Sequence, residues 1–218
     1  MKKLLRICMY SFLLVNQVQA GPVGTALTYV FGNKPVHPEI ALYIAQANKM
    51  LCTDTIGYAM NDFGKTLGLS SFTWGGSTWF DEEIISAVPS KSILEFEATH
   101  EVCHDFCWHG LKRSAVVAAC VLIPQLLLRP YSGITKGIVT VALLACAFPY
   151  FSSLFELQAD AKAAQILCEY DKSNVVKDYC TALEQSNTQN YSYSIMNILL
   201  PSICSKINTL CNSMKSMM

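Results

Sequence analysis

The residues best suited to chemistry in this sequence are two histidines with a glutamate between them. His100 and His104 are four residues apart, so on a helix they lie one turn apart on the same face, and both imidazoles can reach one metal ion. Glu101 lies on the same helix, where it can act as general base on a metal-bound water. Neutral imidazole is a good ligand for zinc, which polarises water without redox chemistry. The pattern therefore predicts a zinc-activated water.

A third protein ligand is expected, because a catalytic zinc usually has three and keeps one position open for water. Cys107 is close in sequence, but a straight helix separates it from His100 by about 10 Å along its axis, too far to share one ion. Metzincins need glycine and histidine where this sequence has Cys107 and Gly110, which excludes that class. The third ligand must therefore come from another part of the chain.

Two acidic residues that follow a long apolar stretch are the candidates. Glu156 and Asp160 are four residues apart and share one helical face. Glu156 can ligate the metal, while Asp160 can accept a hydrogen bond from a ligand imidazole and so fix its tautomer. On their own, the two would be interpreted as solvated carboxylates at a helix start. Beside the histidine pair, they predict a complete site for one Zn²⁺ per chain.

The helices that carry these residues are predicted from their capping patterns. Ser92 and Glu95 form a capping box, and Gly110 is a natural terminator, so one helix is expected between them. Glu156 is expected to open a second helix. His109 lies beside the end of the first helix, where we expect it to interact with the helix dipole rather than with a metal.

The two halves of the predicted site are separated by an apolar hairpin at residues 114–155. The hairpin contains only two charged side chains, Arg129 and Lys136, which divide it into the segments 114–128 and 137–155. The second segment is long enough to cross a bilayer, and the first can do so if its flanking arginines snorkel. We therefore expect a membrane hairpin. The alternative is a helical hairpin buried in a soluble domain.

The N-terminus resembles a secretory signal. Residues 1–20 have a basic start, an apolar run and a small residue, Ala20, at the end. The alternative is an uncleaved anchor. The basic start places residues 21–113 and 156–218 outside the cytoplasm. We therefore expect a membrane-associated protein on the extracytoplasmic side, periplasmic or secretory, with a cleaved and secreted form as the alternative.

Composition limits the remaining choices. The chain has 218 residues, of which 52% are hydrophobic and 15% charged, and its formal net charge is zero. This balance argues against a nucleic-acid binder, which usually has a basic stripe. The length fits one domain over residues 21–218. The ten cysteines include no Cys-x-x-Cys pair, so a zinc ribbon or thioredoxin-like site has no support.

The order of these motifs resembles that of the integral-membrane zinc metallopeptidases typified by bacterial HtpX and the CAAX prenyl proteases. In that family, a His-Glu-x-x-His helix is followed by two membrane segments and then by Glu-x-x-Ala-Asp. Here the corresponding segments are residues 100–104, 114–155 and 156–160. The resemblance covers about residues 70–170. It implies these roles: zinc ligands His100, His104 and Glu156, catalytic base Glu101, and Asp160 as the residue that orients a ligand.

The resemblance also implies a fold. The expected fold class is mainly α with a small β-sheet, a gluzincin-like metallopeptidase domain into which the hydrophobic hairpin is inserted. Residues 77–82 resemble the family's strand before the metal helix, which in gluzincins is the edge that pairs with an extended peptide. The C-terminal family pattern His-Pro-Ser-x-x-x-Arg is weakened here to Leu200-Pro201-Ser202 followed by Lys206. No C-terminal contact with the transition state is therefore predicted.

The function expected from the sequence is a zinc-dependent endopeptidase at a membrane surface. Its expected partners are a polypeptide substrate and membrane lipid, without nucleic acid. The alternative is a non-catalytic membrane-associated or disulfide-stabilised protein with a structural metal site. Such a site would be closed by four protein ligands, and Cys103 or Cys107 could supply the fourth only if the helix were distorted. The sequence predicts neither the cleavage preference nor the oligomeric state.

Overall fold

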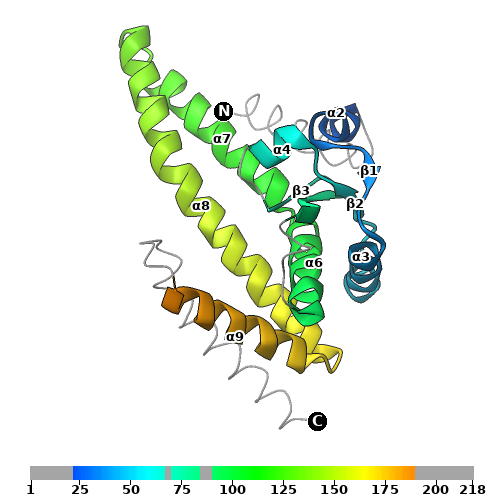
Figure 1. Cartoon of the computed structure of the whole chain (residues 1–218). Helices are drawn as coiled ribbons and strands as arrows, with labels where there is room; N and C mark the ends of the chain where they lie inside the picture. Colours follow the sequence, from blue (N-terminus) through cyan, green and yellow to red (C-terminus); the bar gives the residue numbers. More distant parts are fainter. Residues whose placement is uncertain (1–21, 67–69, 84–89, 190–218) are drawn as a thin grey trace.

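The structure, a computed structural model, describes residues 22–66, 70–83 and 90–189 (Figure 1). The predicted signal at residues 1–20 and the C-terminal segment 190–218 lie outside the described residues. The described chain is mainly helical with a small mixed sheet, as predicted. The helices are α2 (Pro22–Phe31), α3 (Pro38–Leu51), α4 (Asp62–Thr66), α6 (Lys91–Phe106), α7 (His109–Leu127), α8 (Gly133–Glu169) and α9 (Ser173–Gln189). The strands are β1 (Lys34–Pro35), β2 (Ile56–Ala59), β3 (Ser71–Trp74) and β4 (Ser77–Phe80).

The sheet has the order β1-β2-β4-β3, so β3 is an edge strand and β4 lies inside the sheet. β3 and β4 are antiparallel and are joined by Gly75 and Gly76, whose φ angles of 54° and 77° suit glycine in a tight turn. β4 runs parallel to β2 on its other side. The prediction that residues 77–82 form the exposed edge is therefore wrong. The glycine turn folds the preceding strand, β3, onto the outside.

Helix α6 begins and ends at other residues than the sequence predicted. The N-cap is Ser90, whose Oγ accepts a hydrogen bond from the backbone N–H of Ile93 at 3.3 Å, so the capping box at Ser92 is wrong. The helix ends at Phe106 because Trp108 adopts a left-handed conformation with φ 61°. Gly110 does not terminate it.

Gly110 instead lies in the first turn of α7, close to the sheet. A Cβ atom at this position would lie 3.2 Å from the ring of Trp74 on β3. The glycine therefore allows α7 to approach the edge strand closely, and its role is one of packing.

Helix α6 lies at the centre of the described fold and packs against α3, α8 and α9. Its residue Phe96 is 1% exposed and stacks on Tyr179 of α9 with ring centroids 3.7 Å apart. The facing side of α8 carries small side chains, Ala159, Ala163 and Ala164, all buried. Small residues allow two helices to approach closely, so α6 and α8 can bring functional side chains into contact.

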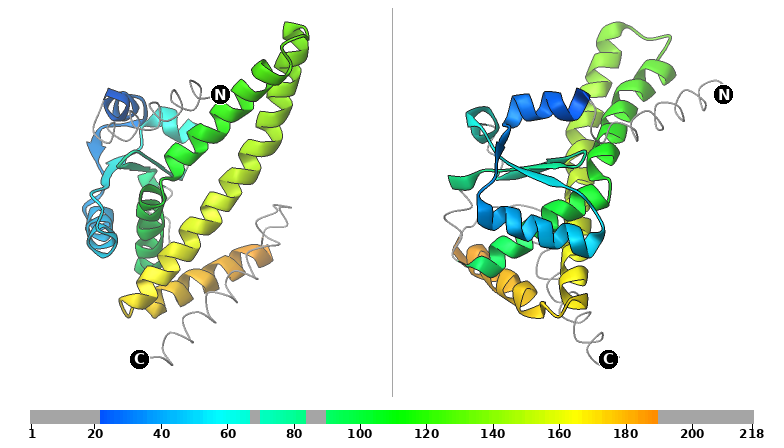
Figure 2. Two further views of the ribbon diagram at one scale, coloured as in Figure 1. Left: turned by 180° about the vertical axis from the view of Figure 1, so that it is seen from behind. Right: turned by 90° about the vertical axis from the view of Figure 1, so that its right-hand side faces the viewer.

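Helices α7 and α8 form a long hairpin that extends away from the rest of the protein (Figures 1 and 2). α8 is one continuous helix of 37 residues that runs through Pro149. Glu156 therefore lies inside α8 and does not open a new helix, because the chain stays helical from the apolar hairpin into the site.

The apolar surface of this hairpin is exposed. Both helices are long and apolar enough to cross a membrane, and the most apolar windows of α7 and α8 are only 17% and 0% buried. Ile134, Ile138 and Val141 of α8 are each more than half exposed. The hairpin is therefore not buried in the domain, the alternative that the sequence left open, and its length and composition suggest membrane association.

The packing of α6 generates a stability prediction. Phe96→Ala removes a buried aromatic ring, so the free energy of unfolding should fall by about 3–5 kcal/mol. Leu42→Ala on α3 is the control, because Leu42 is 56% exposed and the change should cost less than about 1 kcal/mol. Urea denaturation of the detergent-purified protein, followed by circular dichroism, measures both. Equal losses would contradict the assignment of α6 to the core.

Candidate metal centre

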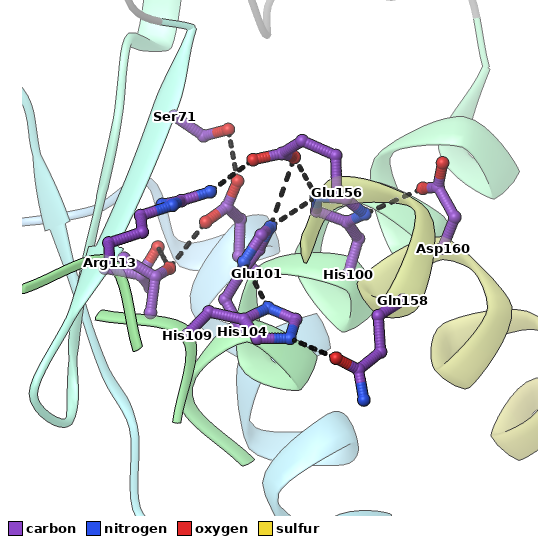
Figure 3. Close-up of polar contacts among 11 residues, drawn as sticks. Ser71, His100, Glu101, His104, His109, Arg113, Glu156, Gln158 and Asp160 are labelled. Carbon is purple, nitrogen blue, oxygen red and sulfur yellow. Dashed lines mark hydrogen bonds and ion pairs between the residues drawn. The ribbon is translucent and has the colours of Figure 1, made fainter. Parts of the chain in front are cut away.

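Three of the predicted residues converge at the contact between α6 and α8 (Figure 3). The Nε2 atoms of His100 and His104 lie 2.9 Å apart. Oε2 of Glu156 lies 3.2 Å from each of these two nitrogens. The structure thus brings together two histidines from one helix and a carboxylate more than 50 residues away, as the sequence predicted.

This triangle has the dimensions of a metal-binding site. A tetrahedral zinc with bonds of about 2.0–2.1 Å has ligand atoms about 3.3 Å apart, close to the three separations found here. The same two histidines also form a group with Glu101. All three residues are buried, and their ligand atoms lie within 4.8 Å of one another, so this group could hold a metal ion. Neither Cys103 nor Cys107 belongs to the group found among the described residues.

The atoms of the triangle are held by further partners. Nδ1 of His100 lies 2.8 Å from Oδ1 of Asp160. The sequence predicted such a contact with a ligand imidazole, without distinguishing His100 from His104. The guanidinium of Arg113 on α7 donates to Oε1 of Glu156, which leaves Oε2 directed at the histidines. The Nε atom of Arg113 is buried without a hydrogen-bond partner among the described residues.

Burial and hydrogen bonding act in opposite directions on the charges of the site. Burial alone would lower the pKa of His100, but the hydrogen bonds to Asp160 and Glu156 outweigh it and raise the pKa well above its ordinary value. Burial alone would raise the pKa of Glu156. The hydrogen bonds to His100 and His104 outweigh burial and lower that pKa well below its usual range. Both shifts favour charges of opposite sign side by side.

The carboxylate of Glu101 is held by the edge strand. Ser71 Oγ donates to one of its oxygens and Thr73 Oγ1 to the other, both at 2.5 Å. Thr78 of β4 lies behind, with its Oγ1 2.8 Å from that of Thr73. Ser71 and Thr73 were not predicted, because their alternation on a strand indicates a shared face without showing which helix that face meets.

His109 occupies a position that the sequence did not predict. It is the first residue of α7, is fully buried, and places Nδ1 2.8 Å from Nδ1 of His104. Its Nε2 lies 3.1 Å from Oε1 of Gln158. Burial lowers the pKa of His109 to about 4, so the ring is neutral at pH 7. The predicted contact with the dipole of α6 is wrong, because the left-handed turn at Trp108 starts a new helix.

A cavity of about 800 Å³ opens in front of the triangle. Its walls come from β3, α6, α9 and the part of the hairpin nearest the site. They include Trp74 on the edge strand, Val117 and Phe148 on the hairpin, Glu97 on α6 and Tyr179 on α9. The cavity therefore connects the candidate metal centre with both the sheet edge and the apolar hairpin.

Comparison with known proteins gives no relative: no family model, no curated protein and no solved structure matches the chain. The chemistry of this site therefore has to be inferred from its own residues and geometry.

Glu97 generates a prediction on pH. Burial, reinforced by the negative charges of Glu101 and Asp160, raises the pKa of Glu97 from 4.5 to about 6. The folded state thus holds this proton more tightly than the unfolded state, so the stabilisation is present below pH 4.5 and is lost as the pH rises through about 6. In metal-free protein at pH 8, Glu97→Gln should raise the free energy of unfolding by at most about 2 kcal/mol relative to wild type, and Tm should rise with it. At pH 5 the difference should be much smaller.

Thermal melts of the two proteins at both pH values measure this effect. Asp178→Asn removes a carboxylate at an exposed position on α9 and should show no comparable pH-dependent difference. A Tm difference between Glu97→Gln and wild type that is equal at pH 5 and pH 8 would contradict the role of the buried charge.

Proposed function

We propose that this protein is a zinc-dependent endopeptidase, with Glu101 as the general base. The observation that carries the proposal is the triangle of His100 Nε2, His104 Nε2 and Glu156 Oε2 beside the Glu101 carboxylate, in front of a cavity. Zinc accepts this set of two imidazoles and one carboxylate at these separations. The resemblance to the HtpX-type family and a gluzincin-like fold form part of the same proposal.

With Glu101 assigned as base rather than ligand, the number of protein ligands is three, which favours catalysis over a structural metal site. Structural zinc sites are closed by four protein ligands, whereas three ligands leave a position for water. Cys103 and Cys107 are free cysteines that do not join the metal group among the described residues. When bound, zinc lowers the pKa of its water and polarises the scissile carbonyl.

The surrounding side chains would transfer the proton and orient the metal ligands. Glu101 takes a proton from the attacking water and returns it to the leaving amine. Ser71 and Thr73 hold its carboxylate next to the metal helix. Asp160 accepts a hydrogen bond from Nδ1–H of His100, which leaves the Nε2 lone pair for the metal. Arg113 occupies Oε1 of Glu156 and so favours ligation through one oxygen.

An extended polypeptide suits the shape of the site. β3 is an edge strand of the sheet and lines the cavity, so a peptide can add to the sheet beside it and pass in front of Glu101. The hairpin residues Val117 and Phe148 line the same cavity. If the hairpin lies in a membrane, the substrate would be cleaved at the membrane surface.

The extracytoplasmic side is the proposed location. The basic start of the predicted signal favours it. Cys168 on α8 forms a disulfide bond, which is typical of proteins in oxidising compartments.

Replacement of the proposed base gives the sharpest test of the mechanism. Glu101→Gln keeps the size of the side chain and can still contact Ser71 and Thr73, with one hydroxyl accepting from the amide NH₂ instead of donating. It cannot take a proton, so the purified variant should keep about one zinc per chain. Its cleavage of β-casein, an unfolded protein probe, should fall by about 10²–10⁴-fold. Metal analysis and gel-based cleavage assays measure the two quantities. Wild-type rates in this variant would refute the assignment of Glu101.

Loss of the third ligand is the counterpart in the same assays. Glu156→Ala should lose zinc as well as activity, since two histidines alone leave the ion incompletely coordinated. Glu169→Ala changes an exposed carboxylate on the same helix and should keep both. A full zinc equivalent in Glu156→Ala would show that the third ligand lies elsewhere.

The natural cysteines test the membrane hairpin. Cys146 on α8 and Cys52 at the end of α3 are both exposed and free in the structure. In open membrane fragments, a water-soluble maleimide should modify Cys52 but not Cys146, because lipid covers the hairpin. Dissolving the membranes in SDS should make both reactive. Peptide mass spectrometry reports each site, and equal labelling before SDS would place the hairpin in water.

A further inference from the structure

The two histidines of the triangle differ in what holds their second nitrogen. A histidine that ligates a metal through Nε2 needs a lone pair there, so the neutral ring carries its proton on Nδ1. For His100, Asp160 accepts a hydrogen bond from that Nδ1–H, as carboxylates commonly do beside metal-bound histidines. For His104, the atom that faces Nδ1 at 2.8 Å is the Nδ1 of His109.

Two ring nitrogens at this distance share one proton, so one donates and the other accepts. If His104 ligates through Nε2, its Nδ1–H donates, and Nδ1 of His109 must be the acceptor. The proton of neutral His109 is then on Nε2, which lies 3.1 Å from Oε1 of Gln158, an oxygen that can only accept. In the series of hydrogen bonds from His104 through His109 to Gln158, every proton therefore has one consistent position.

The packing around His109 keeps this arrangement in place. The ring stacks on Phe155 with centroids 5.0 Å apart and an interplanar angle of 19°. It meets the ring of His104 edge to face at 4.8 Å. Because His109 is fully buried, water does not compete for Nδ1. Ligation through Nε2 of His104 sets the direction of these hydrogen bonds, and the exposed side chain of Gln158 meets Nε2 of His109 with its amide oxygen. The opposite orientation, with the NH₂ turned toward His109, would reverse all protons and leave Nε2 of His104 protonated.

We propose that His109 is a positioning residue for the metal, accepting a hydrogen bond from Nδ1–H of His104 and so holding Nε2 of His104 as the ligand atom. The inference rests on the proposed zinc site. It assigns the same task to two different partners: a carboxylate orients His100, and a neutral imidazole anchored by Gln158 orients His104. Because His109 begins α7, the apolar hairpin is linked directly to the metal helix.

Two substitutions separate this role from packing. His109→Asn keeps an oxygen acceptor near the position of Nδ1 but loses most of the ring. His109→Phe keeps the ring on Phe155 but has no acceptor. The dissociation constant for zinc is measured on the detergent-purified full chain by competition with a fluorescent chelator. The Phe variant should bind zinc about 10–100-fold more weakly than wild type, and the Asn variant within about threefold of it.

The opposite order, with tight binding by His109→Phe and weak binding by His109→Asn, would show a packing role and overturn the proposal, as would equal affinities for all three proteins. ¹⁵N chemical shifts of the zinc-loaded wild type give a second measurement that needs no variant. They should show His109 protonated at Nε2, and a proton on its Nδ1 would overturn the proposal. If wild type binds no zinc at all, the proposed function fails. If wild type binds zinc but the affinities of the two variants differ from those expected, only the role of His109 fails.

Discussion

The contact between one carboxylate and two imidazoles at the meeting of α6 and α8 is the interaction on which the rest of the site depends. Buried charges are costly unless they are paired. The buried Asp160 and the half-buried Glu156 each lie within hydrogen-bond distance of the buried His100, so every one of these groups has a partner. The small side chains on the facing side of α8 make such an approach sterically feasible. The site therefore requires close helix packing, and the packing in turn buries the charges that need partners.

Helix α8 connects this contact to the apolar hairpin. One continuous helix of 37 residues carries exposed apolar side chains in its first part and the site carboxylates farther along. The helix stays continuous through Pro149, which removes one backbone hydrogen bond between the apolar part and the site. On α7, Arg113 reaches Glu156 and His109 reaches His104. Both helices of the hairpin thus contribute side chains to the candidate metal centre, so the orientation of the hairpin and the geometry of the site are physically coupled.

The edge strand β3 performs two tasks. Its hydroxyl groups hold Glu101, and among the described residues it pairs with a strand, β4, on one side only, where we propose that an extended chain adds on the other. Because successive side chains of a strand point to opposite faces, Ser71 and Thr73 face the helix together. A substrate that pairs with the main chain of β3 would therefore lie in register with the residue proposed to act as base. The proposed function would thus place recognition and chemistry on the same short segment.

The sequence by itself determined the features that depend on local spacing. Residues four apart on a helix share a face, which predicted both the histidine pair and the pair Glu156 and Asp160, and the apolar segments predicted the hairpin. The balance of helix and sheet was also predicted correctly. These features follow from backbone periodicity, which is the same wherever a helix occurs.

The tertiary structure alone decided the partners of these residues. Whether His109 meets His104 depends on the left-handed conformation of Trp108, a single backbone choice that spacing does not encode. Whether Ser71 meets Glu101 depends on which strand the glycine turn leaves at the edge. Such contacts join elements far apart in the chain, and their geometry is set by packing. For that reason the sequence indicated the candidate ligands, and the fold revealed the residues that hold them in place.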